Sequence, residues 1–342
     1  MGIVGAFDLH RNQLTYDLVY TETGEVRRGQ VGQADRAHLR AWLERLEGRG
    51  PVEFVVEACT GWRYVVEELT RAGCGVHLAE PAETSVRKGP KKRAKTDEAD
   101  ARHLRELLQR GQVPESWIPP AEVLEARALI RLYKDLMEER TAWAQRICAT
   151  LFHQGVAKPK RVLNTRWREV LPSLELSEAG HRAVEVAQCQ IERLSQEAAV
   201  MRDEIKARAQ AQAACRALAE AHYGVGLLLA YAIWAEMGDA RRFTCSSDAV
   251  RYAGMDITVY ASDSRRSKGH FSRQGQALLR WALYEAAMGA THSRSPDHAY
   301  YLAVKKRHRG DGEIAIITVA RKLARRCYHT LRELGDRWAE AA

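Results

Sequence analysis

Residues 52–57 have the sequence VEFVVE, a compact apolar run that ends in an acid. A run of β-branched and aromatic residues of this length predicts a buried strand. The same pattern occurs near the N-terminus, where the short apolar run 3–7 is followed by Asp8. In α/β sheets the loops at strand ends present functional side chains, so Asp8 and Glu57 are candidate site residues.

Further strand and helix signals surround these two runs. We predict additional strands at 14–20, 26–31 and 76–79, and helices at 34–46, 62–72 and 97–111. The resulting order is three strands followed by helix, strand, helix, strand and helix. This order is typical of ribonuclease-H-like folds, although many other α/β folds share parts of it.

The rest of the chain is predicted to be helical. Long helices are expected at 123–154 and 177–218, and the second has apolar residues spaced by three and four: Ile191, Leu194, Ala198, Met201 and Ile205. Two such helices predict either an antiparallel coiled-coil arm or two helices of an ordinary bundle. Since prolines at 114, 119 and 120 mark a boundary, we expect an α/β domain at 1–118, a helical coiled-coil arm at 119–218 and a mainly helical domain at 219–342.

The composition limits the possible partners. The chain has 342 residues and a formal net charge of +9, which suits nucleic acid, although a merely basic soluble protein is the alternative. Seven scattered cysteines without a CxxC pair argue against a zinc site and a disulfide framework. No apolar run approaches the roughly 18 residues that a membrane span needs. We therefore expect a cytoplasmic, nucleoid-associated protein that binds DNA and no membrane.

Two further acids, Asp97 and Asp100, are three residues apart on a predicted helix and so share one face. In a ribonuclease-H-like arrangement this helix packs over the neighbouring first and fourth strands, which brings both acids to Asp8 and Glu57. Converged carboxylates repel one another unless cations bind, and oxygen ligands suit Mg²⁺ or Mn²⁺. Two ions about 4 Å apart would clamp a scissile phosphate. The alternative is that the acids only cap turns and the helix N-terminus, with Thr96 as N-cap.

A basic segment precedes this predicted helix. Its cationic residues are Arg87, Lys88, Lys91, Lys92, Arg93 and Lys95. Gly89 and Pro90 prevent a continuous helix there. We expect these cations to hold the nucleic-acid backbone on either side of a phosphate bound at the acids.

A second set of motifs lies in the C-terminal part. Residues 254–263 have the sequence GMDITVYASD, residues 268–275 have KGHFSRQG, and Leu279-Arg280 follow. The N-terminal motifs are DLH at 8–10, EACTG at 57–61 and KTDEADA at 95–101. Together these motifs resemble those of the DEDD transposases of the insertion-sequence one-hundred-ten type, which include the Piv-like DNA invertases. The resemblance covers nearly the whole chain.

The resemblance implies a RuvC-like N-terminal domain in which Asp8, Glu57, Asp97 and Asp100 hold the metal ions. It also implies a coiled-coil connector and a helical transposase domain with a nucleophilic serine, which corresponds to Ser262. Relatives of this type recombine DNA through a covalent phosphoserine intermediate, and some use a structured guide RNA that bridges target and donor DNA. They act as oligomers, as a dimer or tetramer, with composite active sites that combine the acids of one subunit with the serine of another.

One departure from the family pattern concerns this serine. The family has glycine directly after it, whereas this chain has Asp263. The aspartate either orients Ser262 or indicates that Ser264 is the nucleophile, and a flexible, serine-rich, phosphate-binding loop is a third interpretation. The nearby cations are predicted either as phosphate contacts or as a solvated basic face: Arg265, Arg266, Lys268, Arg273 and Arg280.

Three classes of function follow from these motifs. The first is an RNA-guided transposase or recombinase. The second is a metal-dependent, RuvC-like junction nuclease that shares the acids and lacks serine chemistry. The third is a non-catalytic nucleic-acid-binding protein, which the presence of all four acids disfavours. The Gly224-Val225-Gly226 turn resembles a helix-hairpin-helix element, and a tight interhelical turn is the alternative.

Overall fold

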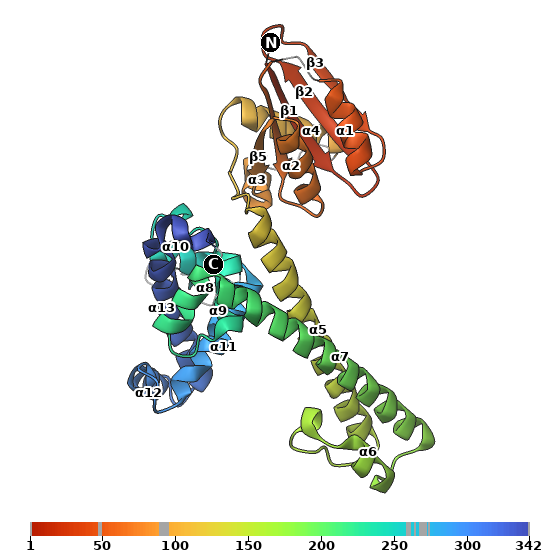
Figure 1. Ribbon diagram of the computed structural model, residues 1–342, viewed down its shortest axis with the longest axis vertical. Helices are drawn as coiled ribbons and strands as arrows, with labels where there is room; N and C mark the ends of the chain where they lie inside the picture. The colour runs from red at the N-terminus through yellow and green to blue at the C-terminus, as the bar shows by residue number, and fades with distance from the viewer. Residues whose placement is uncertain are drawn as a thin grey trace. The chain divides into compact units, whose positions relative to one another are not determined.

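The computed structural model describes residues 2–46, 50–88, 96–257, 272 and 274–340, and the backbone of 261–262 and 265–266. The chain divides into two compact units, Met1–Ile118 and Pro119–Ala342. Their elements are labelled in Figure 1.

The first unit is built on a five-stranded sheet with the order β3-β2-β1-β4-β5. Its strands are β1 (Ile3–Leu9), β2 (Leu14–Tyr20), β3 (Val26–Val31), β4 (Val52–Glu57) and β5 (Gly75–Ala79). The first three strands form an antiparallel meander. Strand β4 is parallel to β1 and to β5, so the carboxyl ends of β1, β4 and β5 lie at one edge of the sheet.

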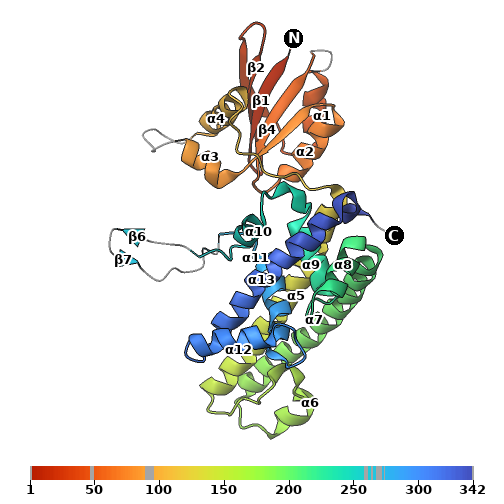
Figure 2. The same cartoon turned by 90° about the vertical axis from the view of Figure 1, so that its left-hand side faces the viewer.

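Helices cover both faces of this sheet: α1 (Arg36–Glu44), α2 (Trp62–Arg71), α3 (Pro81–Arg87) and α4 (Asp97–Gln109). On one face the stacked rings of Phe7 and Phe54 belong to a core that α1 and α2 complete. On the other face Ala6 and Val55 pack against Leu104 of α4. Figure 2 shows α1 and α2 on one side of the sheet and α3 and α4 on the other.

The alternation of side chains along a strand decides which face each acid occupies. Ala6 and Val55 both face α4, and the residues two positions further on are Asp8 and Glu57. Both acids therefore belong to the face that α4 covers, at the carboxyl ends of neighbouring strands.

The sequence-based fold class is confirmed at this level, since a mixed α/β unit with a five-stranded sheet is followed by a mostly helical remainder. Helix α3 was not predicted, since no helix was expected between the strand at 76–79 and the helix at 97–111. In the structure Pro81 occupies the first turn of that helix, where its missing N–H costs nothing, and Glu80 is the N-cap.

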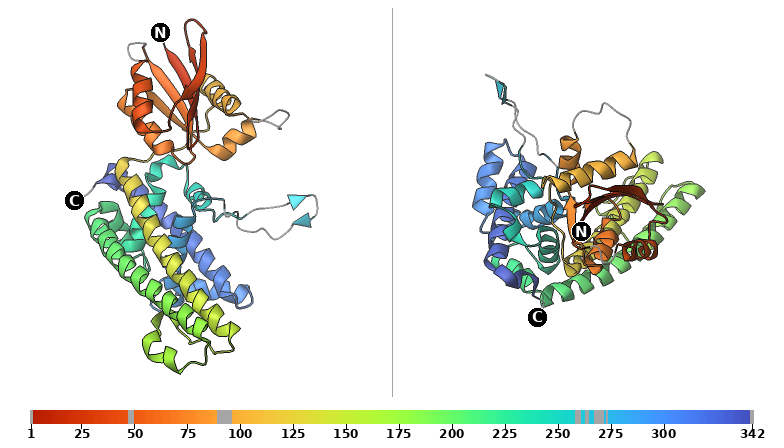
Figure 3. Two further views of the ribbon diagram at one scale, coloured as in Figure 1. Left: turned by 90° about the vertical axis from the view of Figure 1, so that its right-hand side faces the viewer. Right: turned by 90° about the horizontal axis from the view of Figure 1, so that it is seen from above.

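Two long helices, α5 (Ala121–His153) and α7 (Glu178–Ala211), dominate the second unit. They lie side by side, as Figure 3 shows, and a small cluster that includes Ile147, Ile191 and Trp167 joins them near the short helix α6 (Trp167–Val170). The predicted single helix 177–218 is wrong in one respect. Gln212 adopts an extended backbone between α7 and α8 (Ala213–Ala221), and its side chain accepts a hydrogen bond from the Ala213 N–H at 3.0 Å.

The remaining helices are α9 (Leu227–Met237), α10 (Ser246–Tyr252), α11 (Ala277–Met288), α12 (His298–Arg307) and α13 (Gly312–Glu333). Helix α9 is buried continuously from Ala230 to Met237 and forms the centre of this unit. The backbone of two short strands, β6 (Ala261–Ser262) and β7 (Arg265–Arg266), lies between α10 and α11 in the chain. Over the described residues, no helix combines the length and apolar character needed to cross a membrane.

Candidate metal centre

Asp8 and Glu57 are the residues that come directly after two paired residues on neighbouring strands. Phe7 pairs with Val56 across the parallel strands β1 and β4, so the next residue on each strand is an acid. Neighbouring strands are about 4.8 Å apart. The sheet thus places two carboxylates side by side on the α4 face.

The other two predicted acids lie in the first turn of α4. Thr96 is the N-cap, and its hydroxyl accepts a hydrogen bond from the Ala99 N–H at 3.3 Å. Acids are favourable in the first turn because the helix dipole is positive there. Thr96 is therefore the N-cap, as the capping interpretation predicted, and this is compatible with a metal site because the capped turn holds Asp97 next to Asp8.

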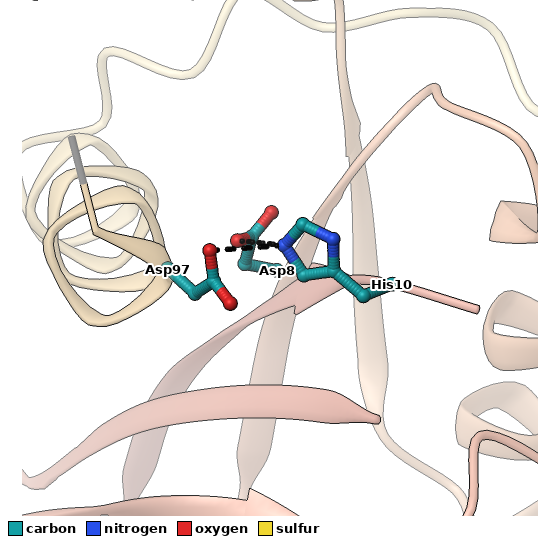
Figure 4. Close-up of side chains that lie close together, drawn as sticks. All are labelled: Asp8, His10 and Asp97. Carbon is teal, nitrogen blue, oxygen red and sulfur yellow. Dashed lines mark hydrogen bonds and ion pairs between the residues drawn. The ribbon is translucent and has the colours of Figure 1, made fainter. Parts of the chain in front are cut away.

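A histidine joins these acids. The Nε2 atom of His10 lies 3.1 Å from Oδ2 of Asp8 and 3.2 Å from Oδ1 of Asp97. One ligand atom from each of the three side chains lies within 4.8 Å of the other two. Figure 4 shows the three side chains pointing toward one another from the end of β1, the adjoining turn and the start of α4.

His10 was not among the predicted site residues. The available signal was its spacing of two from Asp8 within the DLH motif, because residues two apart on an extended chain point to the same face.

The electrostatic environment of Asp8 is that of a crowded carboxyl group. Burial raises its pKa, the His10 imidazole opposes this shift, and the carboxylates of Asp100 and Asp97 raise the pKa further. The pKa of the Cys59 thiol is also raised, first by burial and then by the charges of Glu57 and Asp8. The charges of both strand-end acids therefore raise the pKa of the same thiol, as expected for two adjacent carboxylates.

Two cations of the predicted basic segment belong to the described residues. The ammonium group of Lys88 forms an ion pair with Asp100, so this lysine partly balances the acidic cluster. The guanidinium of Arg87 donates to the Gln112 carbonyl and lies 4.0 Å from Glu83. The other four, Lys91, Lys92, Arg93 and Lys95, lie outside the described residues.

The donor set fits a divalent ion that accepts mainly oxygen ligands. Asp8 and Asp97 each offer a carboxylate oxygen to one point, and His10 offers a nitrogen to the same point. Glu57 and Asp100 are placed next to this group by the strand register and by the first turn of α4. Carboxylates and water suit both Mg²⁺ and Mn²⁺, and a nitrogen ligand is accepted more readily by a transition-metal ion than by Mg²⁺.

The predicted nucleophile lies in the second unit. Ser262 pairs with Arg265 across the short antiparallel strands β6 and β7, and Arg266 pairs with Ala261. Asp263, Ser264, Lys268 and Arg273 lie outside the described residues.

The two ends of the segment that carries Ser262 are joined by hydrogen bonds. The Ser272 N–H donates to the Asp256 carbonyl at 3.1 Å, and its hydroxyl donates to the Asp256 carboxylate. Gly275 packs so closely that an added Cβ would lie 2.4 Å from the Tyr252 carbonyl oxygen. Arg280 donates to the Ala253 carbonyl at 3.0 Å. The C-terminal motifs therefore form the base of the serine segment, and Arg280 contributes to that base.

The protein thus has an α/β unit with an acidic candidate metal site at the carboxyl edge of its sheet, and a second unit that is mostly helical. Residues 7–153 match a family model for DEDD transposases of the IS110 group, described as a transposase. Residues 216–302 match the model of the transposase IS116/IS110/IS902 family. The chain belongs to the IS110-type family of DEDD transposases.

Two curated relatives are similar to this chain. The transposase for insertion sequence element IS1111A of Coxiella burnetii is 26% identical over 239 residues, which cover 68% of this chain and 64% of the relative. A probable family 20 transposase of Pseudomonas aeruginosa is 23% identical over 261 residues, which cover 75% of each chain. The match thus spans less than two thirds of the Coxiella protein.

Proposed function

We propose that this protein is the transposase of an insertion element, and that it cuts and rejoins DNA with divalent ions held by Asp8, Glu57, Asp97 and Asp100. The observation that carries this proposal is the placement of Asp8 and Glu57 in adjacent positions on the sheet face covered by α4, whose first turn holds Asp97 and Asp100. Family membership and the net charge of +9 support DNA as the substrate.

The carboxylates would bind the metal ions and so orient the phosphate. Their closeness to one another favours bound cations. Burial raises the pKa of Asp8, and the neighbouring carboxylates of Asp100 and Asp97 raise it further because like charges repel. Bound Mg²⁺ or Mn²⁺ would supply charge neutralisation and Lewis acidity at a phosphate oxygen. Lys88, which pairs with Asp100, is close enough to the acids to contact the same phosphate backbone.

We further propose that Ser262 is the nucleophile. Its hydroxyl oxygen forms a bond to phosphorus while the bond from phosphorus to a deoxyribose oxygen breaks. The serine proton passes to a neighbouring base, and the released DNA oxygen takes up a proton. A DNA hydroxyl then attacks the phosphoserine in the reverse sense, so strands are rejoined without ATP because the phosphodiester energy is kept in the covalent intermediate.

The proposed organisation has three parts: a RuvC-like metal-binding domain at 1–118, a coiled-coil arm at 119–218 and a helical domain with the serine at 219–342. We propose that the protein acts in the cytoplasm with a structured guide RNA, and as a dimer or tetramer with composite active sites. The family resemblance supports these proposals, and the basic composition suits two nucleic acids bound together.

The decisive experiment detects covalent protein on DNA. The full-length protein is incubated with Mg²⁺, its copurifying RNA and end-labelled DNA that contains the ends of its element. We expect a labelled band on a denaturing gel that disappears after protease treatment, that Ser262→Ala abolishes, and that Ser264→Ala retains. If Ser264→Ala abolishes the band and Ser262→Ala retains it, Ser264 is the nucleophile. Cleavage without any covalent band would replace this function by that of a junction nuclease.

A further inference from the structure

His10 places an imidazole nitrogen between two of the proposed metal ligands. Its side chain is 48% exposed, whereas that of the half-buried Asp8 is 16% exposed, so the ring is the more solvent-accessible member of the pair. The backbone below it is anchored, because the His10 N–H donates to the Gln13 carbonyl at 3.0 Å in the turn between β1 and β2. A fixed turn thus aims the ring at the acids.

The distances around Nε2 match those between ligands of one ion. Neighbouring ligands of an octahedral ion with bonds of about 2.1 Å lie about 3.0 Å apart. The separations of Nε2 from Asp8 and Asp97 are 3.1 and 3.2 Å. In the metal-free protein the same separations suit a hydrogen-bonded imidazole, so the ring needs little movement to exchange one state for the other.

We propose that His10 is a direct nitrogen ligand of the ion that Asp8 and Asp97 bind, and that it shifts the preference of this site from Mg²⁺ toward Mn²⁺. This inference rests on the proposed function, since it requires the acids to bind a divalent ion. Mg²⁺ strongly prefers oxygen ligands and keeps several waters, whereas imidazole suits the transition metals. An acidic site with a built-in imidazole therefore favours Mn²⁺ more than an all-oxygen site does.

The test uses full-length protein and Mn²⁺ alone, so it does not depend on DNA cleavage. Electron spin echo envelope modulation of bound Mn²⁺ detects a directly coordinated imidazole through its nitrogen coupling. We expect this coupling in the wild-type protein, its loss in His10→Asn, and its retention in His38→Asn. His38 is a matched control, because it also contacts an aspartate, Asp35 at 2.9 Å, and is 50% exposed, but lies at the start of α1.

Binding constants provide the second measurement. Because removing even an outer partner of a metal ligand costs about 10–100-fold in affinity, His10→Asn should weaken Mn²⁺ binding by at least about tenfold. Its effect on Mg²⁺ binding should be much smaller, and His38→Asn should change neither constant. Circular dichroism of each variant verifies that the fold is intact.

The outcomes separate this inference from the proposed function. Mn²⁺ that binds in a manner sensitive to Asp8→Asn but shows no nitrogen coupling would overturn the role of His10 and leave the acidic site standing. Mn²⁺ binding that Asp8→Asn leaves unchanged would overturn the acidic site itself. Equal weakening of Mg²⁺ and Mn²⁺ in His10→Asn would overturn the preference for Mn²⁺.

Discussion

Asp8 and Glu57 occupy neighbouring positions on parallel strands, one residue beyond the pair formed by Phe7 and Val56. Two positions earlier on the same face, Ala6 and Val55 pack against α4, so the two acids lie at the end of an apolar strip. Two adjacent carboxylates at a strand end oppose folding through mutual repulsion. A cation held at the proposed site would offset this repulsion.

Neutralising Asp8 should raise the stability of the metal-free protein and lower its DNA cleavage activity. In the metal-free protein Asp8→Asn removes a buried, crowded charge, so we expect the free energy of unfolding to rise by about 1 kcal/mol. DNA cleavage should fall by about 100-fold or more, as when a group that stabilises the transition state is removed. Urea unfolding in EDTA and cleavage of labelled DNA measure the two effects. Asp35→Ala is the control, since it removes the α1 N-cap bond to the His38 N–H and should lower stability.

Truncating Thr96 should loosen the acids of α4. Thr96→Ala removes the N-cap hydrogen bond to Ala99, which typically costs about 1 kcal/mol of stability. The first turn carries Asp97, so the affinity for Mn²⁺ should fall together with stability. Calorimetric titration measures the binding constant. A variant with unchanged Mn²⁺ affinity and lowered stability would show that the cap is not coupled to the site.

A buried ion pair fixes α4 to the sheet. Asp17 of β2 is 1% exposed and pairs with Arg105 of α4, which is 8% exposed. Arg28 also contacts Asp17, at 2.6 Å. Asp17→Ala removes the buried carboxylate that neutralises Arg105 and should cost about 3–5 kcal/mol, whereas Glu25→Ala at the exposed Arg27 pair should cost at most about 1 kcal/mol. Equal effects of the two substitutions on urea unfolding would contradict this assignment.

The strands and the acids were predictable from the sequence because both depend on local pattern. Apolar runs that end in Asp8 and Glu57 predict strand ends, and Thr96 before an acidic turn predicts the start of α4. His10 was missed because its function depends on a turn that aims the ring at Asp97, 87 residues later in the sequence (97 − 10). The interruption at Gln212 was missed because it also involves a distant residue. The N–H of the next residue, Ala213, donates to the Glu340 carbonyl.

Glu68 should make the stability of the first unit sensitive to acid. Hydrogen bonds from Arg40, Arg36 and Arg71, opposed by burial, lower the pKa of this buried carboxyl to about 2. Because the folded pKa lies below the ordinary value, the stabilisation is fully present above about pH 4.5 and is lost as the pH falls toward 2. Glu68→Gln should be less stable than wild type at pH 6, and the difference should shrink with acidification in urea titrations. A difference that does not change with pH would contradict the ion-pair explanation.

Gly275 should be required for the geometry of the serine segment. A Cβ at this position would meet the backbone of Tyr252 and Gly254 at 2.4 and 2.5 Å, which a side chain cannot relieve by rotating. Gly275→Ala should therefore reduce covalent attachment to DNA strongly, while Mn²⁺ binding by the first unit stays unchanged. Gly310→Ala is a poor match because its backbone has a positive φ, so Gly226→Ala, with nothing within 4 Å, is the better steric control.

The central claim is that Asp8, Glu57, Asp97 and Asp100 form a divalent-metal site. Anomalous diffraction from crystals of the full-length protein soaked in Mn²⁺ tests it most directly. We predict an anomalous peak within bonding distance of the Asp8 and Asp97 carboxylates, next to Glu57 and Asp100, which disappears in Asp8→Asn crystals. The absence of a peak at this edge of the sheet at saturating Mn²⁺, with the acids ordered, would contradict the claim.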